Sequence, residues 1–349
     1  IKPEEMEECE KNAKICYGGE YLDYPFQMNI HQLPKEEFID CLYDLFHRPE
    51  KETFADFEDM LLCKFGRGIT ERFLKPYNEK LYACPMNALD PDAMGRFFPY
   101  ASPEQIIDNM KPTGKLDTYN NTFTYPVRGA KTFVDVLVSE IDSRRLHLEA
   151  EVSAVDTARH IAVVGGEELH YQRLISTVPL KAFLKLLPES YRRIGAKLHA
   201  NKELVLNLGF DRKSEAIRGI HWMYFPGEER FFRTCFYDNI LNQERLCMCA
   251  EIGFAEEDAF DVDAELRRTL TDLEKTRVIT GDMKLLKWNA LLLDPAYVHI
   301  TTESREIVEK LQAELRAEEI YLLGRYARWT YIAIEDCMED AKRLAEELQ

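Results

Sequence analysis

The stretch that decides the fold runs Gly324-Arg325-Tyr326-Ala327-Arg328-Trp329-Thr330-Tyr331-Ile332-Ala333-Ile334-Glu335-Asp336-Cys337-Met338. It follows an apolar segment, residues 320–323, that predicts a buried strand, and it precedes residues 339–348, whose pattern predicts an amphipathic helix. A glycine after the strand lets the backbone approach a ligand closely. The start of a helix offers free N–H groups and the positive end of its dipole to an anion. The stretch therefore predicts a site for an electron-rich ring.

A second informative stretch runs from residue 151 to residue 180. It contains a strand pattern at residues 151–156, a Gly165-Gly166 hairpin turn and a second strand that ends Ser176-Thr177-Val178-Pro179. Pro179 ends the strand ladder, and the small residues before it allow a close approach. An ordinary hairpin and a strand that stops at a proline would give the same pattern. Because the Gly324 motif follows downstream, we interpret the stretch as another part of the same site.

Together the two stretches resemble the FAD-binding motifs of the UDP-galactopyranose mutase and amine-oxidoreductase (protoporphyrinogen oxidase-like) flavoprotein superfamily. The resemblance implies that a strand such as 151–156 contacts adenine through its backbone, and that the strand ending at Pro179 passes near the diphosphate. It implies FAD as the cofactor. The residues that the resemblance assigns to the cofactor are Val152, Thr177, Pro179, Gly324, Arg325, Glu335 and Asp336.

Shorter segments resemble the mutase branch in the correct order along the chain. They are residues 24–30, which resemble a mutase segment in which an apolar run ends in Pro-x-Asn, residues 77–82, residues 232–234 around an arginine, and residues 296–298 around a tyrosine. The resemblance implies catalytic roles for Arg233 and Tyr331. The residues that it assigns to substrate binding are Asn29, Tyr77, Asn78, Tyr82 and Tyr297.

The chain also departs from the mutase pattern. The mutase Asp-Met-Asp becomes Ala333-Ile334-Glu335, and Tyr100 stands where an arginine would grip the substrate diphosphate. Residues 221–226, His-Trp-Met-Tyr-Phe-Pro, are more similar to the amine-oxidoreductase branch. The sequence therefore does not decide whether the substrate class is that of the mutase branch or that of the amine-oxidoreductase branch.

The dinucleotide fingerprint Gly-x-Gly-x-x-Gly is absent from the sequence. Gly66-Arg67-Gly68 has the first spacing but lacks the third glycine and a preceding strand. Because the chain begins at Ile1 rather than Met, we expect residues upstream, and the fingerprint either lies there or has been lost. A chain without that unit should expose an apolar sheet face, which predicts aggregation or a homodimer.

The composition of the chain argues against several classes of function. The net charge of −17 argues against a nucleic-acid partner, since phosphate binding needs a basic surface. No apolar run approaches the length of a membrane span. The nine cysteines are scattered and odd in number, so we expect reduced thiols, no metal site and a cytoplasmic location.

The remaining pattern predicts an α+β (α/β) chain, and the resemblance implies a fold of the FAD/NAD-linked reductase type without its first βαβ unit. We expect a mostly helical cap over residues 1–125, parts of an FAD-binding domain at 126–180 and 301–349, and an antiparallel substrate-domain sheet at 181–300. Residues 1–12 are predicted to be a helix or a frayed arm, a helix is expected to stop at Pro76, and strands are expected at 146–148 and 296–300.

The preferred function is an FAD-dependent enzyme acting on a nucleotide sugar for surface-polysaccharide biosynthesis. It would be either a mutase-like isomerase that uses reduced flavin as a nucleophile or an oxidoreductase. One alternative is an amine or protoporphyrinogen-oxidase-like enzyme that oxidises a C–N or C–O bond by hydride transfer. The other is a truncated or degenerate relative without flavin.

Overall fold

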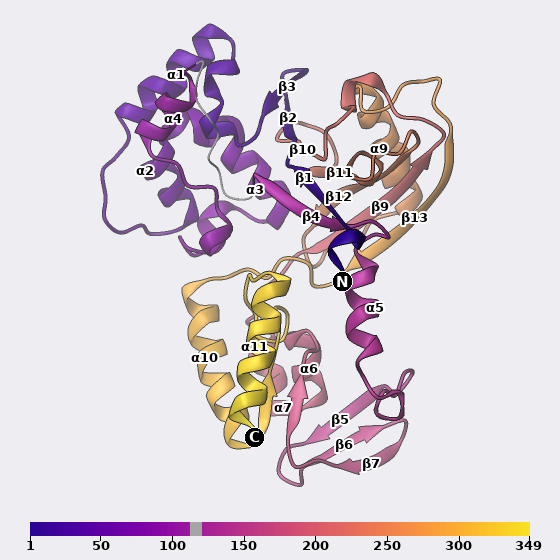
Figure 1. Cartoon of the computed structure of the whole chain (residues 1–349). Helices are drawn as coiled ribbons and strands as arrows, with labels where there is room; N and C mark the ends of the chain where they lie inside the picture. Colours follow the sequence, from indigo (N-terminus) through magenta and orange to yellow (C-terminus); the bar gives the residue numbers. More distant parts are fainter. Residues whose placement is uncertain (112–120) are drawn as a thin grey trace. The chain divides into compact units, whose positions relative to one another are not determined.

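A computed structural model describes residues 1–111 and 121–349, which form two compact units (Figure 1). Unit 1 comprises residues 1–91, 96–141 and 202–294. Unit 2 comprises residues 92–95, 142–201 and 295–349. Each unit is therefore assembled from segments that are far apart in the sequence.

Unit 1 is built on a seven-stranded sheet in the order β13-β9-β12-β11-β10-β2-β3. All neighbouring strands are antiparallel except β10 and β2, which are parallel. The strands are β2 (Ala13–Tyr17), β3 (Glu20–Asp23), β9 (Lys202–Phe210), β10 (Trp222–Tyr224), β11 (Arg233–Phe236), β12 (Leu246–Phe254) and β13 (Leu285–Leu293).

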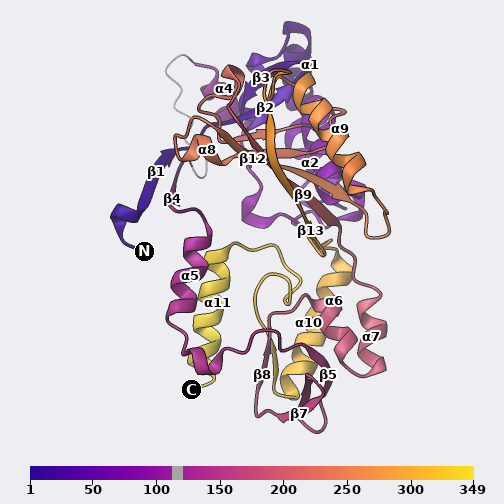
Figure 2. The ribbon, with the colours of Figure 1, turned by 90° about the vertical axis from the view of Figure 1, so that its right-hand side faces the viewer.

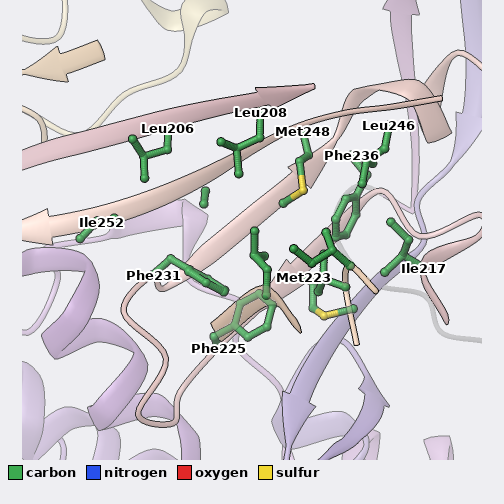
Figure 3. Close-up of a cluster of buried hydrophobic side chains, with 14 of the residues drawn as sticks. Leu206, Leu208, Ile217, Met223, Phe225, Phe231, Phe236, Leu246, Met248 and Ile252 are labelled. Atoms are coloured by element: carbon green, nitrogen blue, oxygen red, sulfur yellow. The ribbon is translucent and has the colours of Figure 1, made fainter. Parts of the chain in front are cut away.

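One face of this sheet carries the main hydrophobic core of unit 1 (Figure 3). Alternate residues of β9 point into it, because side chains of a strand alternate between the two faces. Helix α9 (Val262–Lys275) contributes Leu266 and Leu273 to the same cluster. Each large side chain buried in this way stabilises the fold by about 1.5–3 kcal/mol. The opposite face carries a smaller apolar cluster around Cys235 and Cys249.

The helices of unit 1 come mainly from its N-terminal part. Besides α9, they are α1 (Lys35–Phe46), α2 (Phe57–Ile69), α3 (Lys75–Tyr82), α4 (Pro103–Asn109), α5 (Lys131–Ser139) and α8 (Tyr237–Ile240). A separate two-stranded ribbon joins β1 (Met6–Glu10) to β4 (Thr122–Pro126).

The Gly66-x-Gly68 pair has a packing role. Gly66 has a φ of +74°, and a Cβ there would lie 2.4 Å from the backbone oxygen of Asp44. A Cβ at Gly68 would lie 2.8 Å from the Cα of Cys41. Both glycines therefore let α2 pack tightly on α1, which explains their spacing without a phosphate ligand.

Unit 2 combines a three-stranded antiparallel meander with a small parallel sheet and helices (Figure 2). The meander is β5 (Val152–Asp156), β6 (Ile161–Val164) and β7 (Glu167–His170), and the parallel pair is β8 (Leu174–Ser176) and β14 (Ile320–Leu322). The helices are α6 (Leu180–Leu186), α7 (Glu189–Gly195), α10 (Thr302–Ala317) and α11 (Ile334–Glu347).

Four local predictions were wrong. The acidic arm at residues 1–12 contains strand β1, because it pairs with β4 far along the chain. Pro76 does not end a helix; it lies in the first turn of α3, which continues directly from a π-helical turn over Thr70–Leu74. Residues 146–148 form no strand, and residues 296–300 contribute only the isolated bridge between Ala200 and Val298.

Candidate functional site

The first candidate site lies in unit 2 at one edge of the parallel pair. Because β8 and β14 run in the same direction, both end at this edge. The backbone N–H of Leu323 donates to the carbonyl of Ser176 at 2.9 Å, which brings the chain leading to Gly324 beside the end of β8. Crevices outside the carboxyl ends of parallel strands are preferred ligand sites in α/β folds.

Arg325 is the central cation of this site. Its guanidinium carbon lies 4.4 Å from the ring centroid of Tyr331 and 5.4 Å from that of Tyr297. A third ring, that of Tyr326, lies 5.7 Å away. The rings of Tyr297 and Tyr331 are stacked, with centroids 5.9 Å apart. Three of the predicted residues are thus brought together, and the rings hold the arginine by cation–π attraction.

The start of α11 follows this cluster. The Asp336 carboxylate accepts a hydrogen bond from the Ala333 N–H at 2.8 Å, so it caps the helix. Glu335 lies beside it in the first turn. Acidic groups are favourable at the positive end of a helix dipole. Both predicted residues therefore lie in the first turn of the helix that follows the arginine cluster along the chain, where they have a local role in forming the helix.

The other predicted cofactor residues lie in the same unit. Thr177 and Pro179 follow β8 directly, and the Pro179 carbonyl accepts from the Phe183 N–H at 2.9 Å, which begins α6. Val152 lies on β5, in the separate meander sheet. The structure thus joins Thr177 and Pro179 to the β8–β14 edge and places Val152 on another sheet.

The residues at this edge fit a large polar ligand such as FAD. Gly324 has a φ of +83°, and a Cβ there would meet no atom within 4 Å. Among the described residues, the Ser176 hydroxyl and the Trp329 indole N–H are buried without hydrogen-bond partners. Such groups cost free energy unless a ligand or water pairs with them. A glycine with open space, two orphaned polar groups and a cation form a suitable donor set for a flavin dinucleotide.

The second candidate site lies in unit 1, on the face of the sheet opposite the main core. Tyr224, Arg233 and Glu251 lie in register on the neighbouring strands β10, β11 and β12, and we call these three residues the Arg233 row. The Arg233 Nε donates to Glu251 Oε2 at 2.7 Å. Both side chains are largely buried, so this pair is a strong interaction that fixes the guanidinium in place.

Lys11 adds a second cation close to this row. Its ammonium nitrogen lies 5.0 Å from the ring centroid of Tyr24, and that ring stacks on Tyr224 at 4.6 Å. Burial, and to a smaller degree the charge of Arg233, lower the pKa of Lys11. The result is a polar patch of two cations, one carboxylate and two stacked tyrosines.

The four other residues predicted to bind substrate are buried in unit 1. Tyr77 is 8% exposed and packs edge-on against Tyr224, with centroids 5.6 Å apart. Tyr82 lies in the core, the Asn78 amide donates to the Leu74 carbonyl, and the Asn29 amide donates to the Pro25 carbonyl. Tyr77 therefore contacts the Arg233 row through its ring.

Sequence reasoning missed Lys11, Tyr24, Tyr224 and Glu251. Glu251 had a signal, because it is a lone charge in the otherwise apolar strand pattern of residues 246–254. The others had none, since their proximity depends on strand pairing between distant segments. Within residues 1–111 and 121–349, no group of histidine, cysteine and acidic side chains could hold a metal ion, and no helix has the length and apolarity needed to span a membrane.

A comparison with family models gives a match to flavin containing amine oxidoreductase over residues 31–349. The chain belongs to this family. The membership confirms the predicted resemblance, and it confirms FAD as the cofactor. The family consists of flavin-dependent enzymes.

Solved structures share the fold. A reduced UDP-galactopyranose mutase aligns with a TM-score of 0.87 and 22% identity, over 93% of this chain and 74% of its own. A candidate protoporphyrinogen oxidase from Exiguobacterium sp. 255-15 aligns at 0.74 and 16% identity, over 99% and 82%. Cyclohexylamine oxidase from Brevibacterium oxydans IH-35A aligns at 0.65 and 12% identity, over 99% and 83%. These likenesses confirm the predicted fold class.

Proposed function

We propose that this chain is an FAD-dependent enzyme that acts on a small anionic molecule, with a nucleotide sugar as the preferred substrate. The observation that carries the proposal is the edge of β8 and β14, where Gly324 leaves open space beside Arg325 and two buried polar groups lack partners. Family membership supplies the identity of the cofactor.

In this proposal the chain's own residues bind and orient the cofactor. The Ser176 hydroxyl and the Trp329 N–H donate to it, and Arg325 balances negative charge on it. Gly324 lets the backbone approach. Bound FAD supplies either hydride transfer or a nucleophile for isomerisation. Residues 126–180 and 301–349 are proposed as the FAD-binding part, and residues 181–300 as the substrate sheet.

The Arg233 row supports an anionic substrate that contains rings. Arg233 and Lys11 provide two cations on one patch, which suits a diphosphate. The stacked rings of Tyr24 and Tyr224 provide an aromatic surface for a base or a sugar. Glu251 fixes Arg233, so substitution of either residue should affect substrate binding before the chemical step. A mutase-like role in surface-polysaccharide biosynthesis, in the cytoplasm, follows from this preference.

A second function is favoured by one specific contact. The ammonium of Lys11 already lies over the Tyr24 ring, which demonstrates that this aromatic surface accepts a cation. An amine substrate could use the same surface beside Glu251. The family and its oxidase neighbours support this amine-oxidase-like alternative equally.

The test compares both substrate classes on one preparation. The chain is saturated with FAD, reduced with dithionite and incubated with UDP-galactopyranose, and nucleotide sugars are separated by anion-exchange chromatography. The oxidised protein is incubated in parallel with cyclohexylamine while oxygen consumption is recorded. We expect an isomeric nucleotide sugar from the reaction of the reduced protein with UDP-galactopyranose. Oxygen consumption instead would establish the amine alternative.

Variants connect the activity to the patch. Arg233→Leu should raise the KM for the nucleotide sugar by about 10–100-fold, because the loss of one charge-assisted hydrogen bond weakens binding by about this factor. The control Arg218→Leu removes an exposed arginine of the same unit and should leave KM unchanged. Bound FAD without turnover of either substrate would contradict the proposed function and favour a degenerate relative.

A further inference from the structure

Strand β13 is an unusual edge of the unit 1 sheet. It is nine residues long, Leu285–Leu293, and pairs only with β9 in the part of the chain that the structure describes. Its large apolar side chains are exposed: Leu286 by 67%, Leu291 by 52%, Leu292 by 47% and Trp288 by 37%. Figure 1 shows the strand on the outer side of the sheet. Long apolar edge strands are templates for pairing with another chain.

The other edge of the same sheet is protected. Strand β3 has only four residues and carries Glu20 and Asp23 at its ends. Short, charged edges are the usual defence against pairing. In β13 the only charged residue is Lys287, and there is no acidic residue, although the chain carries a net charge of −17. The two edges therefore differ in length and charge: β13 carries Lys287 and a register irregularity between Leu285 and Lys287, and its residues 288–293 are all uncharged.

The sequence of β13 is complementary to itself. In an antiparallel pairing centred on Asn289, the regular part of the strand from Lys287 to Leu291 pairs with itself, and Trp288 lies opposite Ala290 of the second copy. The largest side chain thus faces the smallest one in both halves. These two positions share a face with Leu208 and Leu206 of β9, which belong to the main core. The pairing would therefore extend the apolar layer of one copy into the other.

The other face is also compatible with this register. Asn289 lies opposite its own copy, and its amide already accepts from Asn207 at 3.0 Å, so polar groups continue across the centre. Lys287 lies opposite Leu291 of the second copy, where its aliphatic stem can cover the leucine while its ammonium reaches water.

We propose that this chain forms a twofold symmetric dimer in which β13 pairs antiparallel with β13 of a second copy, centred on Asn289. The sheet of unit 1 then continues through both molecules. Twofold interfaces of this kind use the same surface on both subunits, which a self-complementary strand satisfies. The inference does not depend on the proposed enzymatic function.

The test uses the sign of a charge at one position. In the proposed register, residue 291 faces Lys287 of the second copy twice per dimer. Leu291→Glu therefore creates two opposite-charge pairs, and Leu291→Lys creates two like-charge pairs. Both substitutions place a charged side chain at the same exposed site, so each is the matched control of the other.

Sedimentation velocity over a concentration series measures the dissociation constant of the full chain and both variants. The wild type is expected to be a dimer, and the dissociation constant of the Lys variant should exceed that of the Glu variant by at least about tenfold. Circular dichroism melting shows whether both variants remain folded. A monomeric wild type, or a dimer whose strength is the same for both signs of charge, would overturn the proposal.

Discussion

Gly253→Ala should destabilise unit 1 by disturbing the contact between a helix and the sheet. Gly253 lies on β12, and a Cβ added there would be 2.2 Å from the backbone oxygen of Lys80 on α3. The clash involves backbone, so no side chain can move aside to relieve it. Helix α3 also carries Tyr77, whose ring packs against Tyr224. The substitution therefore perturbs both stability and the Arg233 row.

The magnitude follows from the geometry. An ordinary contact needs about 3.4 Å, so α3 must move away by about 1 Å, and overpacking of this kind costs about 1–3 kcal/mol. Alanine is more favourable than glycine in a strand by roughly 0.5–1 kcal/mol, and this gain offsets part of the overpacking cost. We expect a net loss of about 1–2 kcal/mol. For a body of this size, that is a decrease of about 2–8 °C in melting temperature.

Gly209→Ala is the matched control. Gly209 lies on the neighbouring strand β9, and a Cβ there would meet only the Lys287 backbone oxygen, at an ordinary 3.5 Å. This variant should melt at or slightly above the wild-type temperature. Thermal melting followed by near-ultraviolet circular dichroism and tryptophan fluorescence measures both variants. Equal melting temperatures for the two alanine variants would refute the proposed packing of α3 on the sheet.

Three further predictions address charge. Burial lowers the pKa of Lys80 to about 8. Between pH 8 and the ordinary lysine pKa of 10.5 the unfolded chain therefore binds more protons than the folded chain, and the free energy of unfolding should rise with pH by up to about 3 kcal/mol. Urea titrations should show that Lys80→Met loses this rise. Glu251→Gln should cost about 1–3 kcal/mol in urea unfolding because Arg233 keeps its charge without its partner, and an unchanged midpoint would exclude the pair as a stabilising contact. Arg325→Met should weaken FAD binding about tenfold or more in a fluorescence titration, and unchanged affinity would remove the arginine from the site.

Much of the fold could be predicted from local patterns. Strands β9, β12 and β13 and helices α9 and α10 follow directly from alternating or helical periodicity. The errors arose where distant partners decide the structure. The acidic residues 6–10 have a helical composition, yet they form a strand because residues 122–126 pair with them. Local propensity is too weak to outweigh such pairing.

The candidate site was predictable only in part. Gly324, Arg325 and Tyr331 lie within one short segment, so their proximity was visible in the sequence, and Tyr297 was found through resemblance. Lys11 was missed, because nothing in its neighbours indicates that it reaches Tyr24 and the row around Arg233. The spacing of Gly66 and Gly68 is ambiguous in the sequence, since tight helix packing and phosphate binding both select glycine.

The most direct test of the central claim is the visible spectrum of the chain after incubation with FAD and desalting. We expect a flavin band that survives desalting in the wild type and is lost or strongly reduced in Arg325→Met. Arg343→Met, which changes an exposed arginine of the same unit, should keep the band. A wild-type chain that retains no flavin even after incubation with excess FAD would contradict the assignment of the Gly324 edge as the cofactor site.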